Sequence, residues 1–165
     1  MLTLTRDDGY TISTDPGRLD LDRVHRWLST DAYWAIGRDH ATVTRAFAGS
    51  IGFGVYRPVD GRQVAVARVI TDRVTFGYLC DVYVDRTERG RGLGTWLAGT
   101  VRDHLASLGV RRLLLATVDA HGLYQKLGFA AVEAERWMEL DRRDLAVNPL
   151  TGKEQSTGPA LTVEP

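Results

Sequence analysis

Residues 79–94 have the sequence LCDVYVDRTERGRGLG, and this stretch decides how the middle of the chain folds. It opens with mostly apolar and β-branched residues, a composition that is typical of a strand. A short charged turn follows, with glycines at positions 90, 92 and 94. Beyond the turn, apolar residues recur at the spacing of one helix face, at Leu93, Leu97, Val101, Leu105 and Leu108. The stretch therefore predicts a strand, a glycine-rich turn and a helix in succession.

The predicted turn has the properties of a phosphate-binding site. The first N–H groups of a helix lack intrahelical acceptors, and the helix dipole adds positive potential at the same end. Glycines allow a ligand to approach the backbone closely, and Arg89 and Arg91 add formal positive charge. We therefore expect phosphate groups to bind here. The alternative interpretation is a solvated glycine-rich turn with basic neighbours.

Two of the known phosphate-binding motifs do not fit this turn. A P-loop ends in Gly-Lys-Ser or Gly-Lys-Thr, which the turn lacks, and the dinucleotide motif needs a third glycine where this chain has Leu97. The pattern that remains is Arg-x-x-Gly-x-Gly, at Arg89, Gly92 and Gly94. It resembles the GNAT superfamily of acyl-coenzyme-A-dependent N-acyltransferases, in which this turn wraps the pyrophosphate of coenzyme A. The resemblance implies acetyl-CoA as acyl donor and a set of cofactor-binding residues, several of which act through their backbone: Val82, Tyr83, Val84, Arg89, Gly90, Arg91, Gly92, Leu93, Gly94 and Thr95.

A second GNAT-like motif lies at residues 120–129, AHGLYQKLGF. The family repeats the alanine, the Leu-Tyr pair, the lysine and the terminal Gly-Phe. The resemblance implies that Tyr124 donates a hydrogen bond or a proton to the sulfur of coenzyme A. The alternative is that Tyr124 is a core tyrosine on an apolar helix face. The chain departs from the family at Thr117, where asparagine is common. The hydrogen bond by which that asparagine braces the short helix of this motif is therefore not expected here.

Asp81 is the candidate catalytic base, since it lies in the strand that should face the thioester. Strand alternation predicts that it shares a face with Leu79 and Tyr83. Asp81 could instead face solvent or pair with an arginine, and a water chain could replace a dedicated base. His121 is a weaker candidate for the base.

The rest of the sequence predicts a mixed α/β (α+β) architecture. A short strand is expected at residues 10–13, and helices are expected at residues 21–30, with Asp20 as N-cap, and from about Asp39. Strands at 51–56, 63–70 and 74–84, joined by tight turns, would form an antiparallel meander.

The glycine-rich turn and its helix then lead to a strand at residues 111–118 that is apolar on both faces. Such a strand is expected to be buried on both sides and parallel to the strand before the helix. Asp119 is expected to cap the next short helix, and strands from Phe129 and at 137–140 would end the fold. This order resembles the GNAT fold, a mixed, mainly antiparallel sheet with two splayed parallel strands, flanked by helices. We expect one domain over residues 1–147 and an irregular or disordered tail over residues 148–165.

The composition is that of a soluble globular protein. The 165 residues are 44% apolar and 25% charged with zero net charge, which argues against nucleic acid or an anionic membrane as the main partner. Cys80 is the one cysteine, and the four histidines show no metal-ligand spacing, so we expect no metal. The first residues lack a secretory signal, and a cytoplasmic protein is expected.

The sequence and the resemblance together predict an N-acetyltransferase. It would move an acetyl group from acetyl-CoA to a primary amine of a small molecule, by direct attack through a tetrahedral intermediate. Tyr33, Trp34 and Arg38 are the candidate acceptor-binding residues, because an arginine near aromatic rings could hold an acceptor carboxylate. The two aromatics could equally fill the core. The alternative functions are a protein or peptide N-acetyltransferase and a non-catalytic acyl-CoA-binding module, and a homodimer is one expected assembly.

Overall fold

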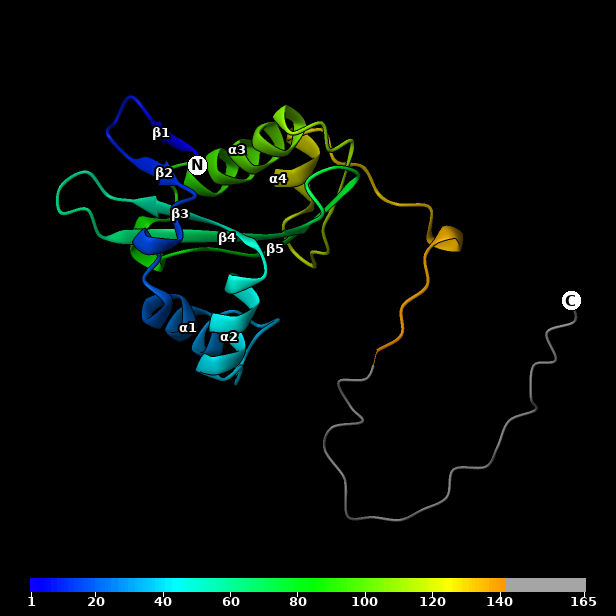
Figure 1. Ribbon diagram of the computed structural model, residues 1–165, viewed down its shortest axis with the longest axis horizontal. Coiled ribbons are helices and arrows are strands. Elements are labelled where there is room, and N and C mark those ends of the chain that lie inside the picture. The colour runs from blue at the N-terminus through cyan, green and yellow to red at the C-terminus, as the bar shows by residue number, and fades with distance from the viewer. Residues whose placement is uncertain (142–165) are drawn as a thin grey trace, which may run out of the picture. The chain divides into compact units, whose positions relative to one another are not determined.

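A computed structural model describes residues 1–141 as two compact units, residues 1–130 and a second unit that begins at Ala131. The first unit contains a six-stranded sheet with four helices (Figure 1). The strands are β1 (Thr3–Thr5), β2 (Thr11–Ser13), β3 (Ile51–Tyr56), β4 (Gln63–Thr71), β5 (Phe76–Val84) and β6 (Arg112–Leu114). The helices are α1 (Leu21–Thr30), α2 (His40–Ala48), α3 (Leu93–Ser107) and α4 (His121–Lys126).

The strands follow one another across the sheet in the order of the sequence. Each neighbouring pair from β1 to β5 is antiparallel, and β5 pairs with β6 in parallel after the crossover through α3. This confirms the predicted meander and the mixed sheet. The parallel pairing is short, since it joins only residues 76–78 of β5 to residues 112–114 of β6. β6 ends at Leu114, so among the described residues no strand pairs with this side of β5 beyond Tyr78.

The helices cover both faces of the sheet (Figure 1). On one face, the apolar side of α3 packs on β2, β3, β4 and β5, with Leu97, Val101 and Phe53 fully buried. On the other face, α1 and α2 pack on the later part of β5 and on Val66 of β4. Both helices begin as predicted, because Asp20 and Asp39 each accept a hydrogen bond from a backbone N–H in the first turn.

Several sequence predictions fail at the ends of the sheet. The prediction misses β1, a three-residue strand whose residues are all exposed and carry no buried alternation. The strand predicted at 111–118 contracts to β6, and it is not buried on both sides, because Arg112 is exposed and Leu113 and Leu114 are only half-buried. Asp119 does not cap α4; Ala120 occupies the N-cap position and offers no side-chain acceptor.

The strands predicted from Phe129 and at 137–140 are absent from the described residues. The second unit contains a short 3₁₀ helix at Ala134–Arg136, followed by chain without regular secondary structure up to residue 141. Met138 and Leu140 are 99% and 78% exposed, so these apolar side chains of the predicted 137–140 strand are not buried in the described structure. The predicted domain end at residue 147 and the tail after it lie outside the described residues.

Candidate active site

The glycine-rich turn connects β5 to α3 through two left-handed residues. A 3₁₀ helix at Arg86–Glu88 comes first, capped by Asp85, whose Oδ1 accepts from the N–H of Thr87 at 3.0 Å. Gly90 and Gly92 then have φ angles of 80° and 72°, which strongly favour glycine. Gly92 is the N-cap of α3 and supplies no side-chain acceptor, so the first N–H groups of the helix lack a capping partner.

The space above this turn is open. A Cβ atom built on Gly90 would meet nothing within 4 Å, and one on Gly92 would meet only Nη1 of Arg6, at 3.9 Å. Arg89 and Arg91 beside it have side chains 53% and 59% exposed. The turn therefore combines free backbone donors, positive charge and room for a ligand, as a phosphate requires.

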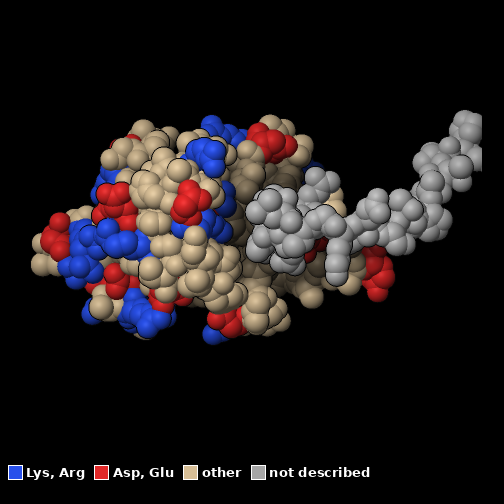
Figure 2. Space-filling view, turned by 90° about the horizontal axis from the view of Figure 1, so that it is seen from below, with Lys and Arg blue, Asp and Glu red and all other residues tan. Residues whose placement is uncertain are grey.

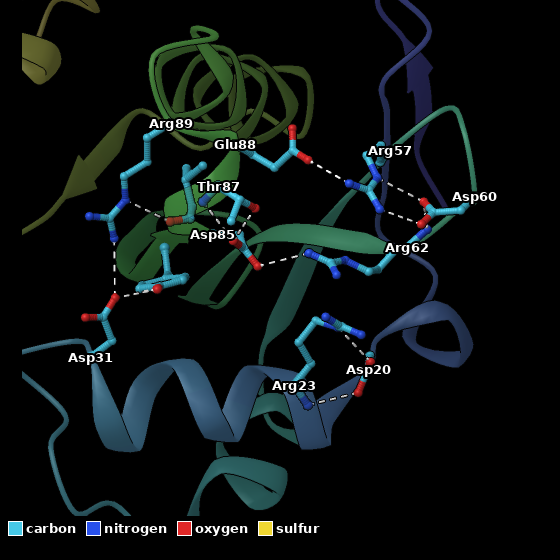
Figure 3. Close-up of polar contacts among 12 residues, drawn as sticks. Asp20, Arg23, Asp31, Arg57, Asp60, Arg62, Asp85, Thr87, Glu88 and Arg89 are labelled. Carbon is cyan, nitrogen blue, oxygen red and sulfur yellow. Dashed lines mark hydrogen bonds and ion pairs between the residues drawn. The ribbon is translucent and has the colours of Figure 1, made fainter.

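Glu88 holds the turn from its buried side, and no local pattern in the sequence distinguishes this residue. Its side chain is 4% exposed, and Oε2 accepts from the hydroxyl of Tyr10 at 2.6 Å and pairs with Nε of Arg91 at 3.4 Å. Its other oxygen, Oε1, accepts from Nη1 of Arg57 at 3.1 Å (Figure 3). The hydrogen bond to Glu88 raises the pKa of Tyr10. A buried carboxylate thus joins the turn to β2 and β3.

Asp31, at the end of α1, forms an ion pair with Arg89 of the turn (Figure 3). Nε of Arg89 donates to the carbonyl of Val84 at 3.1 Å, and Nη2 lies 3.5 Å from Oδ2 of Asp31. The same carboxylate accepts from the hydroxyl of Tyr83 at 2.5 Å and pairs with Arg86. Asp31 ends α1 and starts the segment that carries Tyr33, Trp34 and Arg38, so that segment is tied directly to the turn.

A bulge in β5 changes the predicted placement of Asp81. Val66 pairs with Tyr83 and Arg68 pairs with Cys80, so β5 has one more residue than β4 between these positions. Asp81 lies in the bulge with a φ angle of 51°, which is unusual for a residue other than glycine. Across the bulge the faces switch, because Leu79 packs in the α3-side core and Tyr83 in the α1–α2-side core. The prediction that simple alternation places Leu79, Asp81 and Tyr83 on one face is therefore wrong.

The Asp81 carboxylate is 2% exposed and surrounded by donors. Oδ2 accepts from Nε of Arg68 at 2.7 Å, and Oδ1 accepts from Nη1 of Arg38 at 3.0 Å and Nε1 of Trp34 at 3.3 Å. Both oxygens therefore already accept hydrogen bonds from guanidinium groups. This geometry favours the alternative in which Asp81 forms an ion pair, while its role as a base stays a prediction.

The aromatic residues of the α1–α2 connection are exposed, contrary to a core role. Tyr33 and Trp34 are 53% and 40% exposed, and their rings meet edge to face at 4.9 Å. The Tyr33 hydroxyl accepts from the N–H of Val118 at 3.3 Å, which joins this connection to the segment between β6 and α4. The predicted acceptor residues therefore lie between the bulge of β5 and the segment that leads to Tyr124.

Tyr124 lies on α4 and is 9% exposed, with its ring edge to face against Phe129 at 5.6 Å. Burial, followed by the charges of Asp119 and Tyr33, raises the pKa of Tyr124 to about 12, so the phenol keeps its proton at neutral pH. Among residues 1–141, its hydroxyl forms no hydrogen bond. Thr117 braces the start of α4, since its Oγ1 accepts from the N–H of Ala120 at 3.1 Å.

The turn, the later part of β5 and α4 meet at the start of α3. A Cβ atom at Gly94 would lie 3.6 Å from Val84 and 3.7 Å from Leu123, the residue before Tyr124. Val82 and Val84 pack with Leu123 against the same core as α3. The structure therefore brings the two sequence motifs together beside the part of β5 that β6 leaves unpaired.

Arg6 is a further residue near the turn that the sequence did not suggest. It comes from the connection between β1 and β2, and its guanidinium lies 5.1 Å from the ring centre of Trp96 and 5.4 Å from that of Tyr10. A surface depression of about 460 Å³ lies along α3 close by, but none of the predicted site residues line it. Its lining residues are Leu2, Leu4, Trp96, Gly99, Thr100, Asp103, His104 and Ser107.

Comparison with known proteins agrees with this geometry. Residues 21–129 match the family model described as Acetyltransferase (GNAT) family. The chain belongs to the GNAT acetyltransferase family. The Gibberella zeae protein named putative acetyltransferase FG08082 is 36% identical over 140 residues, which cover 74% of this chain and 78% of that protein.

Solved structures share the fold of this GNAT acetyltransferase. A crystal structure of a GNAT family protein from Xanthomonas campestris pv. campestris is 44% identical, with a TM-score of 0.76, and the match covers 84% of this chain and 97% of that one. A Clostridium acetobutylicum protein crystallised with acetyl-CoA has a TM-score of 0.64 at 18% identity, over 82% and 97% of the two chains, and supports the fold alone.

Membership of the GNAT acetyltransferase family makes the chain an acyltransferase, and the family uses acetyl-CoA. The open glycine turn with its unpartnered N–H groups fits the phosphates of that donor. Figure 2 shows basic and acidic side chains interspersed over the face viewed, so that face is not uniformly basic. Among residues 1–141, no helix combines the length and apolar composition of a membrane span, and no three His, Cys, Asp or Glu side chains form a metal-like group.

Proposed function

We propose that this GNAT acetyltransferase moves the acetyl group of acetyl-CoA to the primary amine of a small molecule. The observation that carries the proposal is the junction of the open turn, the part of β5 that β6 leaves unpaired and α4, where Val84, Gly94 and Leu123 are neighbours. An acyl donor bound through its phosphates at the turn has its thioester arm guided along β5 towards Tyr124.

The turn is proposed to bind the pyrophosphate through the N–H groups of Leu93, Gly94 and Thr95, with Arg89 and Arg91 adding charge. Leu93 itself is 2% exposed, so only its backbone is available to the ligand. The backbone of residues 82–84 is proposed to hold the pantetheine arm, which agrees with the absence of a strand partner for these residues on the β6 side among the described residues.

Tyr124 is proposed to donate a hydrogen bond or proton to the departing sulfur. A thiolate that leaves into a partly buried site is stabilised by a donor, and a phenol donates without carrying charge. The raised pKa of about 12 and the free hydroxyl both suit a donor and argue against a base. Because both Asp81 oxygens accept from arginines, we propose that water carries the amine proton to solvent.

The amine is proposed to enter beside Tyr33, Trp34 and Arg38, which lie on the side of β5 that carries Asp81. A small-molecule acceptor is the preferred class, with a protein or peptide amine as the alternative. A cytoplasmic location, a homodimer and the lack of a metal stay predictions from the sequence.

The substitution Gly92→Ala should weaken acetyl-CoA binding by about 10-fold or more, since a lost hydrogen bond to a charged group typically costs about 1.5–3 kcal/mol. Gly109→Ala is the matched control, because Gly109 has a similar φ angle of 86° at the other end of α3 and faces open space. Both variants should lose about 1 kcal/mol of stability from left-handed strain. Calorimetry that finds equal acetyl-CoA affinity in the two variants would refute the assigned phosphate site.

Cys80 is proposed to be structural, although it adjoins Asp81. Burial raises the pKa of its thiol to about 11, so almost no thiolate exists at neutral pH, and Sγ lies 3.5 Å from the Arg68 carbonyl. Cys80→Ala should therefore keep turnover within about 2-fold of the original enzyme. An acetyl group found on Cys80 by mass spectrometry after mixing with acetyl-CoA would instead indicate a covalent route.

The function is tested by incubating the protein with acetyl-CoA and a panel of primary amines, with free thiol and acetylated amine measured together. Acetyl transfer predicts equal amounts of both products with at least one small amine. Acetylation confined to peptides would favour the protein-substrate alternative, whereas binding of acetyl-CoA without any product would favour a non-catalytic module.

A further inference from the structure

We propose that the acceptor amine also carries a carboxylate, and that Arg38 binds it. This rests on the proposed acetyltransferase function and names the class of its substrate: an α-amino acid or similar molecule with an apolar side chain. The inference follows from a charge imbalance around Asp81 and from the surroundings of Arg38.

One buried carboxylate faces two guanidinium groups. Asp81 pairs with Arg68 at 2.7 Å and with Arg38 at 3.0 Å, so the three groups carry one net positive charge. Among residues 1–141, Asp31 and Asp39 form no ion pair with Arg68 or Arg38. Asp31 pairs with Arg86 and Arg89, and Asp39 caps α2 by accepting from Thr42.

The excess charge is accessible at Arg38. The Arg68 side chain is 11% exposed, and its Nη1 donates to Oγ of Ser50 at 3.1 Å. Arg38 is 25% exposed, and only its Nη1 has a recorded acceptor among residues 1–141. Its remaining N–H groups form a planar fork that can bind a carboxylate through two parallel hydrogen bonds. Asp81 fixes the orientation of that fork.

Exposed apolar side chains are linked to Arg38 through Asp81 and through the segment that carries it. Trp34 donates to the same Asp81 carboxylate as Arg38, and Tyr33 packs edge to face on Trp34. Ile36 lies between Trp34 and Arg38 in the sequence and is 60% exposed. Val118, whose N–H bonds to Tyr33, is 77% exposed on the facing segment. A ligand whose carboxylate is bound by Arg38 therefore meets aromatic and aliphatic surface, which favours an apolar side chain.

The test uses amines that differ in the anionic group alone. Phenylalanine, phenethylamine, phenylalaninamide and the phosphonate analogue of phenylalanine form one set, and leucine with isoamylamine forms a second. The enzyme should acetylate the amino acid of at least one set with a kcat/KM about 10- to 100-fold above that of the amine without an acidic group. The phosphonate separates a preference for carboxylate from a general preference for anions.

Variants of Arg38 assign the preference to this residue. Arg38→Gln should bring the ratio of kcat/KM for the amino acid to kcat/KM for the amine without an acidic group close to one, while acetylation of that amine continues. Arg38→Lys should keep part of this preference for the amino acid. Comparing ratios between variants cancels the different basicities of the amines. Arg45→Gln, which changes an exposed arginine of α2, should leave the ratio unchanged.

Three results would overturn the inference. The first is equal acetylation of the amino acids and of the amines without an acidic group, and the second is a phosphonate preferred over the carboxylate. The third is an Arg38→Gln enzyme that loses both activities equally, since that would make Arg38 purely structural. Failure of the proposed function is a separate outcome, in which acetyl-CoA binds and no amine in either set, or in the wider panel, is acetylated.

Discussion

Asp81→Asn should lower the free energy of unfolding by about 3 kcal/mol, because removing one partner of a buried ion pair leaves the other charges uncompensated. Arg68 and Arg38 would both lose their carboxylate partner. Asparagine tolerates the left-handed backbone at this position, so the change tests the charge more than the bulge. For a chain of this length, the expected fall in melting temperature is roughly 10 °C.

The control for this prediction is Asp103→Asn on α3. Asp103 also pairs with an arginine, at 2.7 Å, but its side chain is 67% exposed, so the change should cost at most about 0.5 kcal/mol. Thermal and urea unfolding measure both variants. If Asp81→Asn unfolds like the original protein yet loses turnover that rising pH restores, then Asp81 is the base and the ion-pair interpretation fails.

Tyr124→Phe should reduce kcat by about 10- to 100-fold, or about 1.4–2.7 kcal/mol in the barrier. The lower part of the range for acid catalysis is expected, because a thiolate is already a fair leaving group. The Kd for acetyl-CoA should hardly change, since only a hydroxyl without a partner among the described residues is removed. Steady-state kinetics and calorimetry on the same preparation measure the two quantities.

Tyr56→Phe provides a matched control. The Tyr56 hydroxyl is buried without a hydrogen-bond partner among residues 1–141, and burial raises its pKa to about 12, as for Tyr124, but it lies at the end of β3 beside Arg18. This variant should keep full kcat. A Tyr124→Phe enzyme with full kcat would leave Tyr124 as a packing residue, whereas loss of acetyl-CoA binding would mean that the hydroxyl is structural.

The raised pKa of Tyr124 also sets the expected pH profile. A donor is lost as pH rises through its pKa in the folded protein, which for Tyr124 is about 12. Titration of Tyr124 should therefore cause no fall in kcat between pH 7 and pH 10. An alkaline fall in that range that disappears in Tyr124→Phe would contradict the environment assigned to this phenol.

Local sequence patterns predicted the centre of the fold well. Alternating strands, the tight turns between them and the aspartates that begin α1 and α2 are local signals, and each of these appears where the pattern places it. The ends of the sheet were predicted poorly. β1 has no buried face to reveal it, and the apolar run around Leu114 suggested a longer and more buried strand than β6.

The candidate site was predicted only in part, because local patterns reveal some of its residues and contacts between distant segments reveal the others. Motifs with fixed spacing located the turn and Tyr124, but contacts between distant segments leave no such spacing. Glu88 looks like a solvated charge in the sequence, yet it is buried against Tyr10 and Arg57. The bulge at Asp81 was also missed, because it depends on the register with β4 and not on the composition of β5.

The most direct test of the central claim is a single-turnover experiment with the full-length protein, acetyl-CoA and an amine acceptor. We expect free thiol and N-acetylated amine to appear together, at a rate that depends on the amine and falls by about 10- to 100-fold in Tyr124→Phe. The contradicting result is a protein that binds acetyl-CoA tightly but releases thiol no faster than the solution reaction, with no acetylated amine. That result would make the chain a binding module.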